Sequence, residues 1–266
     1  MNRSFKRRVR DTSSRRIVMA AAALLVTTLT GCSTLNGVVS PAAVRAEAVR
    51  SHNKPSSGQA SGPVDCSVAK CVALTFDGGP SEPTPHLLDF LKREGVPATF
   101  FLQGKGHTDT YPDIVRRMAD EGHEIANHTW SHENLTELTP DEIRAEIEPV
   151  QQDIEKATGR APTLMRPPGG ATNDEVKKVM KELGLAQILW SVTAKDYATT
   201  DSGLIKQRVL DQTKRDGIIL LHERYSGTIP AVPGIVSELR DRGYTFVTVS
   251  QLLAPAHPEP GKVYRP

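Results

Sequence analysis

Short apolar runs alternate with longer amphipathic segments between residues 71 and 249. Short apolar runs bounded by turn residues are typical of buried strands, and apolar residues that recur every three or four positions are typical of helices. The pattern predicts strands over residues 71–76, 98–102, 124–126, 163–165, 187–190, 217–221 and 245–249. Between them it predicts helices over residues 84–94, 111–121, 140–158, 173–183, 203–214 and 232–242.

Start and stop signals agree with these helices. A glycine just after the last periodic residue is a common helix end, and it occurs five times, at Gly95, Gly122, Gly159, Gly184 and Gly243. The run Thr-Pro-Asp-Glu over residues 139–142 is typical of a helix start with proline at its first position. Repeated strand-helix units require a parallel sheet, either an open doubly wound sheet or a closed barrel.

Reactive side chains follow the predicted strands, and in both architectures the carboxyl ends of the strands gather at one edge. Asp77 follows the first strand, His128 and His132 the third, Arg166 the fourth, Asp196 the fifth and His222 the sixth. Two histidines four residues apart project from one side of a helical turn and can bind one divalent ion, whose bound water becomes a nucleophile. Each residue alone also fits an ordinary turn, cap or core position, but the set predicts a metalloenzyme.

The first 31 residues are typical of an export signal. Seven basic residues precede an apolar stretch over residues 17–29, and Gly31 and Cys32 follow it. The stretch is too short for an ordinary membrane span, and the small residues before Cys32 resemble a bacterial lipobox, in which the cysteine is lipidated. An uncleaved anchor helix is the alternative, and the Sec and Tat routes stay open. We expect a lipoprotein on the outer face of the cytoplasmic membrane, or a secreted protein.

The basic character of the chain belongs to this signal. The whole chain has 33 Lys+Arg and 31 Asp+Glu, and residues 1–31 hold seven and one of them, which leaves 26 against 30 and a net charge of −4. No basic cluster with interleaved aromatics remains, so we expect no nucleic-acid partner. Cys66 and Cys71 precede the first strand of an exported chain, where oxidation is permitted, so we expect a disulfide rather than two buried thiols.

The composition predicts a single folded domain. Residues 32–65 are rich in Ser, Ala, Gly and Pro without a sustained apolar period, which predicts a flexible linker. Residues 66–253 are enough for one sizeable core and show no internal repeat, and residues 254–266 predict a Pro-rich tail. We expect a monomer that reaches the membrane through its N-terminal lipid.

The motifs and their order resemble the polysaccharide deacetylases, the NodB-homology or carbohydrate esterase family four proteins, over residues 72–253. The resemblance implies a distorted (β/α)7 barrel. It also implies that Asp77, in Thr-Phe-Asp, is the catalytic base, and that His128 and His132, in His-x-x-x-His, bind zinc or cobalt. Arg166, in Arg-Pro-Pro, is expected to keep the base carboxylate ionised. His222, in Leu-Leu-His, is the expected general acid.

The resemblance implies further that Asp196, in Lys-Asp-Tyr, tunes the acid histidine, and that Tyr197 stands where the family usually has Trp. There are three departures from the family pattern. Gly169 replaces a common Tyr and leaves only its backbone N–H for an oxyanion, while Ser191 and Thr193 stand where acidic residues are common. Trp130 and Trp190 fit either sugar-stacking or core positions.

The third departure is Gly78, which stands where the family has its metal-ligand Asp. Two imidazoles and water would hold an ion less tightly than two imidazoles and a carboxylate. Alternatively Asp77 itself moves onto the metal, or Asp109 or Glu133 contributes a ligand. The expected cofactor is therefore a divalent ion, zinc or cobalt, that is weakly held.

These residues favour a metal-dependent hydrolase that removes N-acetyl groups from an extracellular polysaccharide, either peptidoglycan or chitin-like oligosaccharides. The alternative is a catalytically inactive carbohydrate-binding pseudo-deacetylase, which the loss of the ligand at Gly78 favours. The retained Asp77, Arg166 and His222 favour the enzyme. A small-molecule amidase on the same fold is a further possibility.

Overall fold

The computed structural model describes residues 37–51 and 64–266. The predicted export signal, Cys32 and half of the predicted linker lie outside the described residues. Within the part that is described, no helix is long and apolar enough to cross a membrane.

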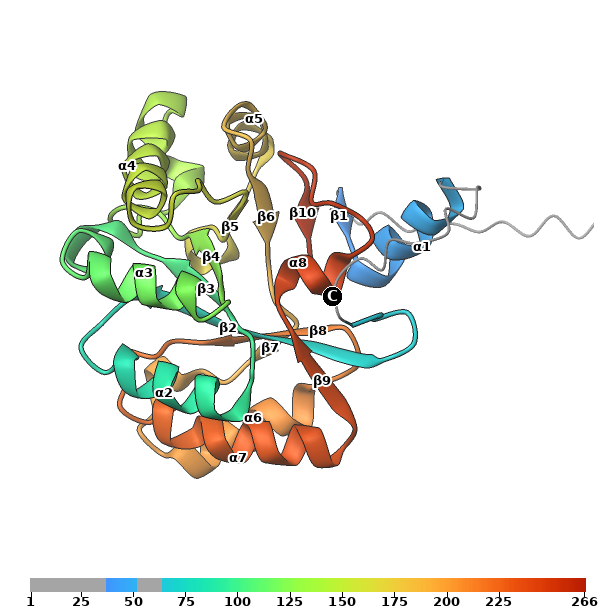
Figure 1. The fold of residues 1–266 in the computed structure, drawn as a ribbon. Coiled ribbons are helices and arrows are strands. Elements are labelled where there is room, and N and C mark those ends of the chain that lie inside the picture. The colour runs from blue at the N-terminus through green and yellow to red at the C-terminus, as the bar shows by residue number, and fades with distance from the viewer. Residues whose placement is uncertain (1–36, 52–63) are drawn as a thin grey trace, which may run out of the picture. The chain divides into compact units, whose positions relative to one another are not determined.

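All strand pairs of the described chain are parallel and form one curved sheet (Figure 1). The strand order is β1-β10-β6-β5-β4-β3-β2-β8-β7, and β9 pairs with β2 as well. The strands are β1 Val38–Val39, β2 Lys70–Gly79, β3 Thr99–Leu102, β4 Glu124–Asn127, β5 Leu164–Met165, β6 Ala186–Ile188, β7 Val192–Thr193, β8 Gly217–Leu221, β9 Tyr244–Val247 and β10 Val263–Tyr264. Among the described strands, β1 and β7 are the two ends of this order and do not pair with each other. The curved sheet therefore stays open as a half-barrel.

The helices follow the strands around this half-barrel. They are α1 Pro41–Ser51, α2 Thr84–Glu94, α3 Pro112–Asp120, α4 Pro140–Thr158, α5 Asp174–Glu182, α6 Ser202–Gln212, α7 Thr228–Asp241 and α8 Val249–Leu253. Neighbouring helices touch in the order α6, α7, α2, α3, α4, α5, which repeats the order of the strands they connect. The predicted (β/α)7 type of fold is confirmed.

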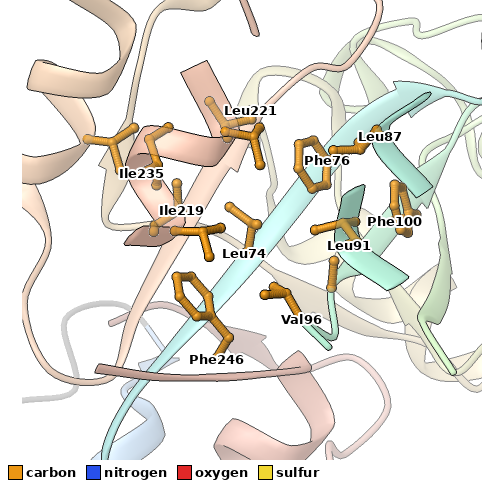
Figure 2. Packing of buried hydrophobic residues seen from close by; sticks show 14 of the residues in the cluster. Leu74, Phe76, Leu87, Leu91, Val96, Phe100, Ile219, Leu221, Ile235 and Phe246 are labelled. Atoms are coloured by element: carbon orange, nitrogen blue, oxygen red, sulfur yellow. The ribbon is translucent and has the colours of Figure 1, made fainter. Parts of the chain in front are cut away.

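The central strand β2 has two different faces. Leu74 and Phe76 are fully buried against Leu87 and Leu91 of α2 and Phe100 of β3 (Figure 2). Each such side chain stabilises the fold by roughly 1.5–3 kcal/mol through its burial. Because side chains alternate along a strand, the intervening Thr75 and Asp77 point to the opposite face, inside the half-barrel. The packing of β2 thus aims a carboxylate inward.

Part of the segment predicted to be a flexible linker is ordered, and so is the predicted tail. β1 pairs with β10, and β10 pairs with β6, so residues before and after the central domain extend its sheet. In α1, Arg45 is buried and donates hydrogen bonds to the carbonyl of Leu252 and to Asp216. The sequence pattern missed these elements because long-range pairing, rather than a local apolar period, holds them.

Replacing Arg45 with Ala is expected to lower the free energy of unfolding by about 3 kcal/mol, because it leaves the Asp216 carboxylate buried without its close partner. Urea denaturation measures the loss. Arg50→Ala is the matched control, since Arg50 is exposed in the same helix and should change stability by less than about 0.5 kcal/mol. Equal effects of the two variants would contradict the docking of α1.

Cys66, in the turn before β2, and Cys71, the second residue of β2, form a disulfide, as predicted. The guanidinium of Arg215 donates hydrogen bonds to the carbonyls of Cys66 and Ser67, which fixes this turn at the start of the central strand. The turn therefore helps to set the register of β2.

Candidate active site

Asp77 lies near the carboxyl end of β2 and is held by a buried arginine. Nη1 of Arg166 donates to Oδ1 of Asp77 at 2.6 Å and to the hydroxyl of Thr75 at 2.8 Å. Arg166 is completely buried, with its Cζ 4.0 Å from the centroid of the Phe101 ring. Its Nε donates to the carbonyl of Ile188. The arginine is fixed from several sides, so it fixes one carboxylate oxygen of Asp77 and leaves the other, Oδ2, facing the site.

His128 and His132 come together, but not on a helical turn as the sequence spacing suggested. Both Thr129 and His132 have a φ of 68°, in the left-handed region, so the chain folds back in a strained loop. The side chain of Asn127 accepts a hydrogen bond from the backbone N–H of Thr129, and Glu146 accepts two from Ser131. The ring centroids of His128 and His132 are 5.0 Å apart.

The orientation of His128 is fixed by Arg166, the residue that follows β5. Its Nδ1 lies 2.7 Å from the carbonyl oxygen of Arg166, which can only accept, so Nδ1 carries the proton. Nε2 then faces Oδ2 of Asp77 at 3.7 Å. Burial lowers the pKa of His128 to about 4, so the ring is neutral at pH 7 and Nε2 is an acceptor.

His222, which follows β8, and Asp196, which follows β7, form a second pair. Phe76 of β2 pairs with Leu221 of β8, so the next residues of the two strands, Asp77 and His222, lie at the same level of the sheet. Nδ1 of His222 lies 2.9 Å from Oδ1 of Asp196. Burial would raise the pKa of Asp196, but hydrogen bonds from His222 and Thr228 outweigh it and hold that pKa below its usual value.

Two long side chains after His222 lie against the glycines after Asp77, and no sequence motif predicted this contact. A β-carbon on Gly79 would lie 1.6 Å from Oε1 of Glu223, and one on Gly78 would lie 3.3 Å from Cζ of Arg224. Glu223 is buried, with Thr84 donating to Oε1 at 3.3 Å, and Oε2 has no hydrogen-bond partner among the residues that the structure describes. Gly79 is therefore needed for the packing of Glu223, and Gly78 lies in close contact with the guanidinium of Arg224.

The donor set does not fit the divalent ion that the resemblance implies. The described residues contain no group of three or more His, Cys, Asp or Glu side chains that could hold a metal ion. Gly78 offers no side chain, and Oδ1 of Asp77 is already bound to Arg166. The guanidinium of Arg224 stands beside Gly78, and after burial it is the next largest cause of the lowered pKa of His132. Positive charge thus takes the place of an anionic ligand.

The other residues considered from the sequence lie as follows. Asp109 and Glu133 are exposed, and Asp109 accepts a hydrogen bond from Thr110, so neither joins the site. Trp130 and Trp190 are half-buried and pack against the two main core clusters. A β-carbon on Gly169 would meet nothing within 4 Å, so the missing aromatic residue leaves open space there.

Glu223→Gln is expected to change how stability depends on pH. Burial raises the pKa of Glu223 from 4.5 to about 7, so the stabilising protonated form is complete below pH 4.5 and is lost as pH rises through 7. Between pH 4.5 and 8, the free energy of unfolding of the variant should rise by about 3 kcal/mol relative to that of wild type. Urea unfolding at several pH values measures this gain. Exposed Glu155→Gln is the control, and parallel curves for both variants and wild type would contradict the assignment.

A comparison with known proteins identifies the class of this site. The family model described as polysaccharide deacetylase matches residues 65–188. The peptidoglycan-N-acetylglucosamine deacetylase PgdA of Listeria monocytogenes is 39% identical over 184 residues, which cover 69% of this chain and 39% of that protein. A peptidoglycan-N-acetylglucosamine deacetylase of Bacillus cereus is 38% identical over 194 residues, covering 71% of this chain and 90% of the relative. The chain spans less than half the length of the Listeria relative.

Solved structures agree with this. A structure named T48 deacetylase with substrate has a TM-score of 0.72 and 41% identity, covering 76% of this chain and 99% of that chain. A mutant of a CE4 family pseudoenzyme with restored enzymatic activity has a TM-score of 0.66 and 31% identity, covering 70% and 68%. The chain belongs to the polysaccharide deacetylase family, carbohydrate esterase family 4. The predicted family is confirmed.

Proposed function

We propose that this chain removes N-acetyl groups from an N-acetylated polysaccharide outside the cell, with peptidoglycan as the substrate class. One observation carries the proposal: Asp77 held by Arg166 and His222 held by Asp196 lie at the same level of adjacent strands. A buried ion pair contributes little net stability to the fold, because well-packed apolar residues of similar volume would often stabilise the fold as much. Retention of both pairs therefore favours a chemical role.

The base step belongs to Asp77. Its Oδ2 accepts a proton from the attacking water, while Oδ1 stays bound to Arg166. The neutral Nε2 of His128, 3.7 Å from Oδ2, is a second acceptor that orients the same water. The water oxygen then forms a bond to the acetyl carbon. His132 lies beside His128 and completes this wall of the site.

The acid step belongs to His222. Asp196 binds Nδ1 and the backbone N–H of His222, which orients the ring and leaves Nε2 toward the site. His222 donates the proton that the departing amine needs when the carbon–nitrogen bond breaks. Acetate and a free amino sugar are the products. Tyr197, which is 56% exposed and packs edge-on against His222, offers a ring for a sugar face.

The substrate class and the location rest on further support. Both relatives described above are named peptidoglycan-N-acetylglucosamine deacetylases. The predicted export signal and lipidated Cys32 would hold a monomeric chain at the outer face of the cytoplasmic membrane, next to peptidoglycan. Only the predicted signal has an excess of basic residues, which agrees with a glycan partner rather than a nucleic acid.

The second candidate function is a catalytically inactive glycan-binding protein. The loss of the ligand at Gly78 and the similarity to a pseudoenzyme structure favour it. Acetate release from purified peptidoglycan and from chitooligosaccharide, measured beside glycan binding by calorimetry, separates the two. The proposal expects acetate and free amine with peptidoglycan, whereas glycan binding without acetate would reject it in favour of the second candidate.

A further inference from the structure

Arg224 occupies the space that a ligand at position 78 would need. A β-carbon on Gly78 would lie 3.3 Å from both Cζ and Nη1 of Arg224. An ion bound by an aspartate lies roughly 3–4 Å from the β-carbon, since metal–oxygen distances are about 2.0–2.2 Å. The guanidinium therefore fills the volume in which a carboxylate at this position and its ion would lie.

The charge of Arg224 is not neutralised by a close carboxylate. Among the described residues, no Asp or Glu oxygen lies within ion-pair distance of it, and its polar contact is the hydroxyl of Tyr225 at 3.5 Å. Its Cζ lies 5.3 Å from the centroid of the Tyr225 ring. The side chain is half-buried, so its N–H donors are partly shielded from water without strong protein acceptors. Such donors favour an anionic or carbonyl oxygen of a ligand.

The neighbouring residues hold Arg224 in this position. His222 is anchored to Asp196, and Glu223 is buried against Gly79, so the chain that leads to Arg224 is fixed at two successive residues. Gly78 in turn has a φ of +76°, a conformation that glycine adopts without steric cost. The two glycines and the two long side chains form one packed unit at the ends of β2 and β8.

We propose that Arg224 is the resident cation of this site. It excludes a divalent ion from the space beside Gly78, and it donates hydrogen bonds to the acetyl carbonyl oxygen as negative charge develops there. The second part rests on the proposed deacetylation. The first part concerns the charge and volume of the site and holds independently of it.

Zinc binding by the purified chain, measured by calorimetry with folding checked by circular dichroism, tests the first part. Arg224→Gln should raise zinc affinity by at least about tenfold, because it removes a like charge next to the two imidazoles. Gly78→Asp alone should stay within about threefold of wild type, because the new carboxylate pairs with Arg224. The double variant should bind at least about a hundredfold more tightly than wild type.

Arg116→Gln is the matched control, because Arg116 is exposed on α3 and its loss should leave zinc affinity unchanged. Zinc binding by wild type as tight as that of the double variant would overturn exclusion by Arg224. A folded double variant without improved zinc binding would overturn it as well. Gly78 has a positive φ, which strains a side chain placed there. Aspartate adopts this left-handed region more readily than most residues, and circular dichroism checks that the Gly78→Asp variants fold.

Acetate release in the presence of a chelator tests the second part. Wild type should keep its rate, and Arg224→Gln should lower kcat about a hundredfold with little change in KM, since an oxyanion donor acts in the transition state. Arg224→Lys, which keeps the charge, should recover part of the rate. Unchanged kcat in Arg224→Gln would overturn the donor role. Absence of acetate release by wild type, with the zinc series as expected, would reject the deacetylase and leave metal exclusion standing.

Discussion

Asp77→Asn is expected to lower kcat for acetate release from peptidoglycan by about a thousandfold, because an amide cannot accept the proton of the attacking water. The amide oxygen can still accept the hydrogen bond from Arg166, so the local geometry is retained. KM should change little, since the loss lies in the chemical step. Initial rates over a range of peptidoglycan concentrations measure both quantities.

The change also leaves Arg166 buried without an anionic partner, which is expected to lower the free energy of unfolding by about 3 kcal/mol. Rates are therefore compared at a temperature where urea denaturation shows both proteins folded. Asp109→Asn is the control, since this exposed carboxylate takes no part in the site. A folded Asp77→Asn protein with the wild-type rate would show that another group is the base.

His222→Gln is expected to lower kcat about a hundredfold on the amide substrate, because the departing amine loses its proton donor. An aryl acetate ester needs little protonation of its leaving group, so the same variant should hydrolyse it nearly as fast as wild type does. Asp77→Asn should be slow on both substrates. The ratio of amide to ester rates therefore distinguishes an acid from a residue that only maintains the structure.

His86→Gln is the matched control for this change, because His86 is exposed at the start of α2. Equal losses on amide and ester in His222→Gln would contradict proton donation to the leaving group. Asp196→Asn should shift the ratio in the same direction by a smaller factor, since Asp196 acts through the orientation of His222.

The sequence predicts most of the fold because most elements carry a local pattern. The helices over residues 84–94 and 140–158 and the strand over residues 217–221 have the predicted bounds. The two-residue strands β1, β7 and β10 were missed, because pairing with distant segments, rather than their own sequence, fixes them. Val249 was predicted as the end of the strand over residues 245–249, but Thr248 and Gln251 form a capping box that starts α8 at this residue.

The candidate site was predictable where a motif carried a residue's chemistry. Asp77, Arg166, Asp196 and His222 pair as expected, because each lies at the carboxyl end of a parallel strand. The segment from His128 to His132 is a loop rather than the predicted helical turn. It was not predictable, because the positive φ angles of Thr129 and His132 leave no periodic pattern in the sequence.

The packing of Glu223 and Arg224 on two glycines was not predictable. About 145 residues separate the two segments, and only the parallel pairing of β2 with β8 brings them together. Two features of the sequence could have indicated this contact. Gly78 stands where the family has an acidic ligand, and an arginine follows two residues after His222. With glycine at position 78 and Arg224 beside it, the site has positive charge where the family pattern has a carboxylate.

The most direct test of the account is a double-variant cycle on acetate release from peptidoglycan, with wild type, Asp77→Asn, His222→Gln and the combined variant. If a base and an acid act in one reaction, the combined variant should be no more than about threefold slower than Asp77→Asn, because losses within one catalytic unit do not add. A wild-type rate equal to that of the combined variant would contradict hydrolysis by this pair.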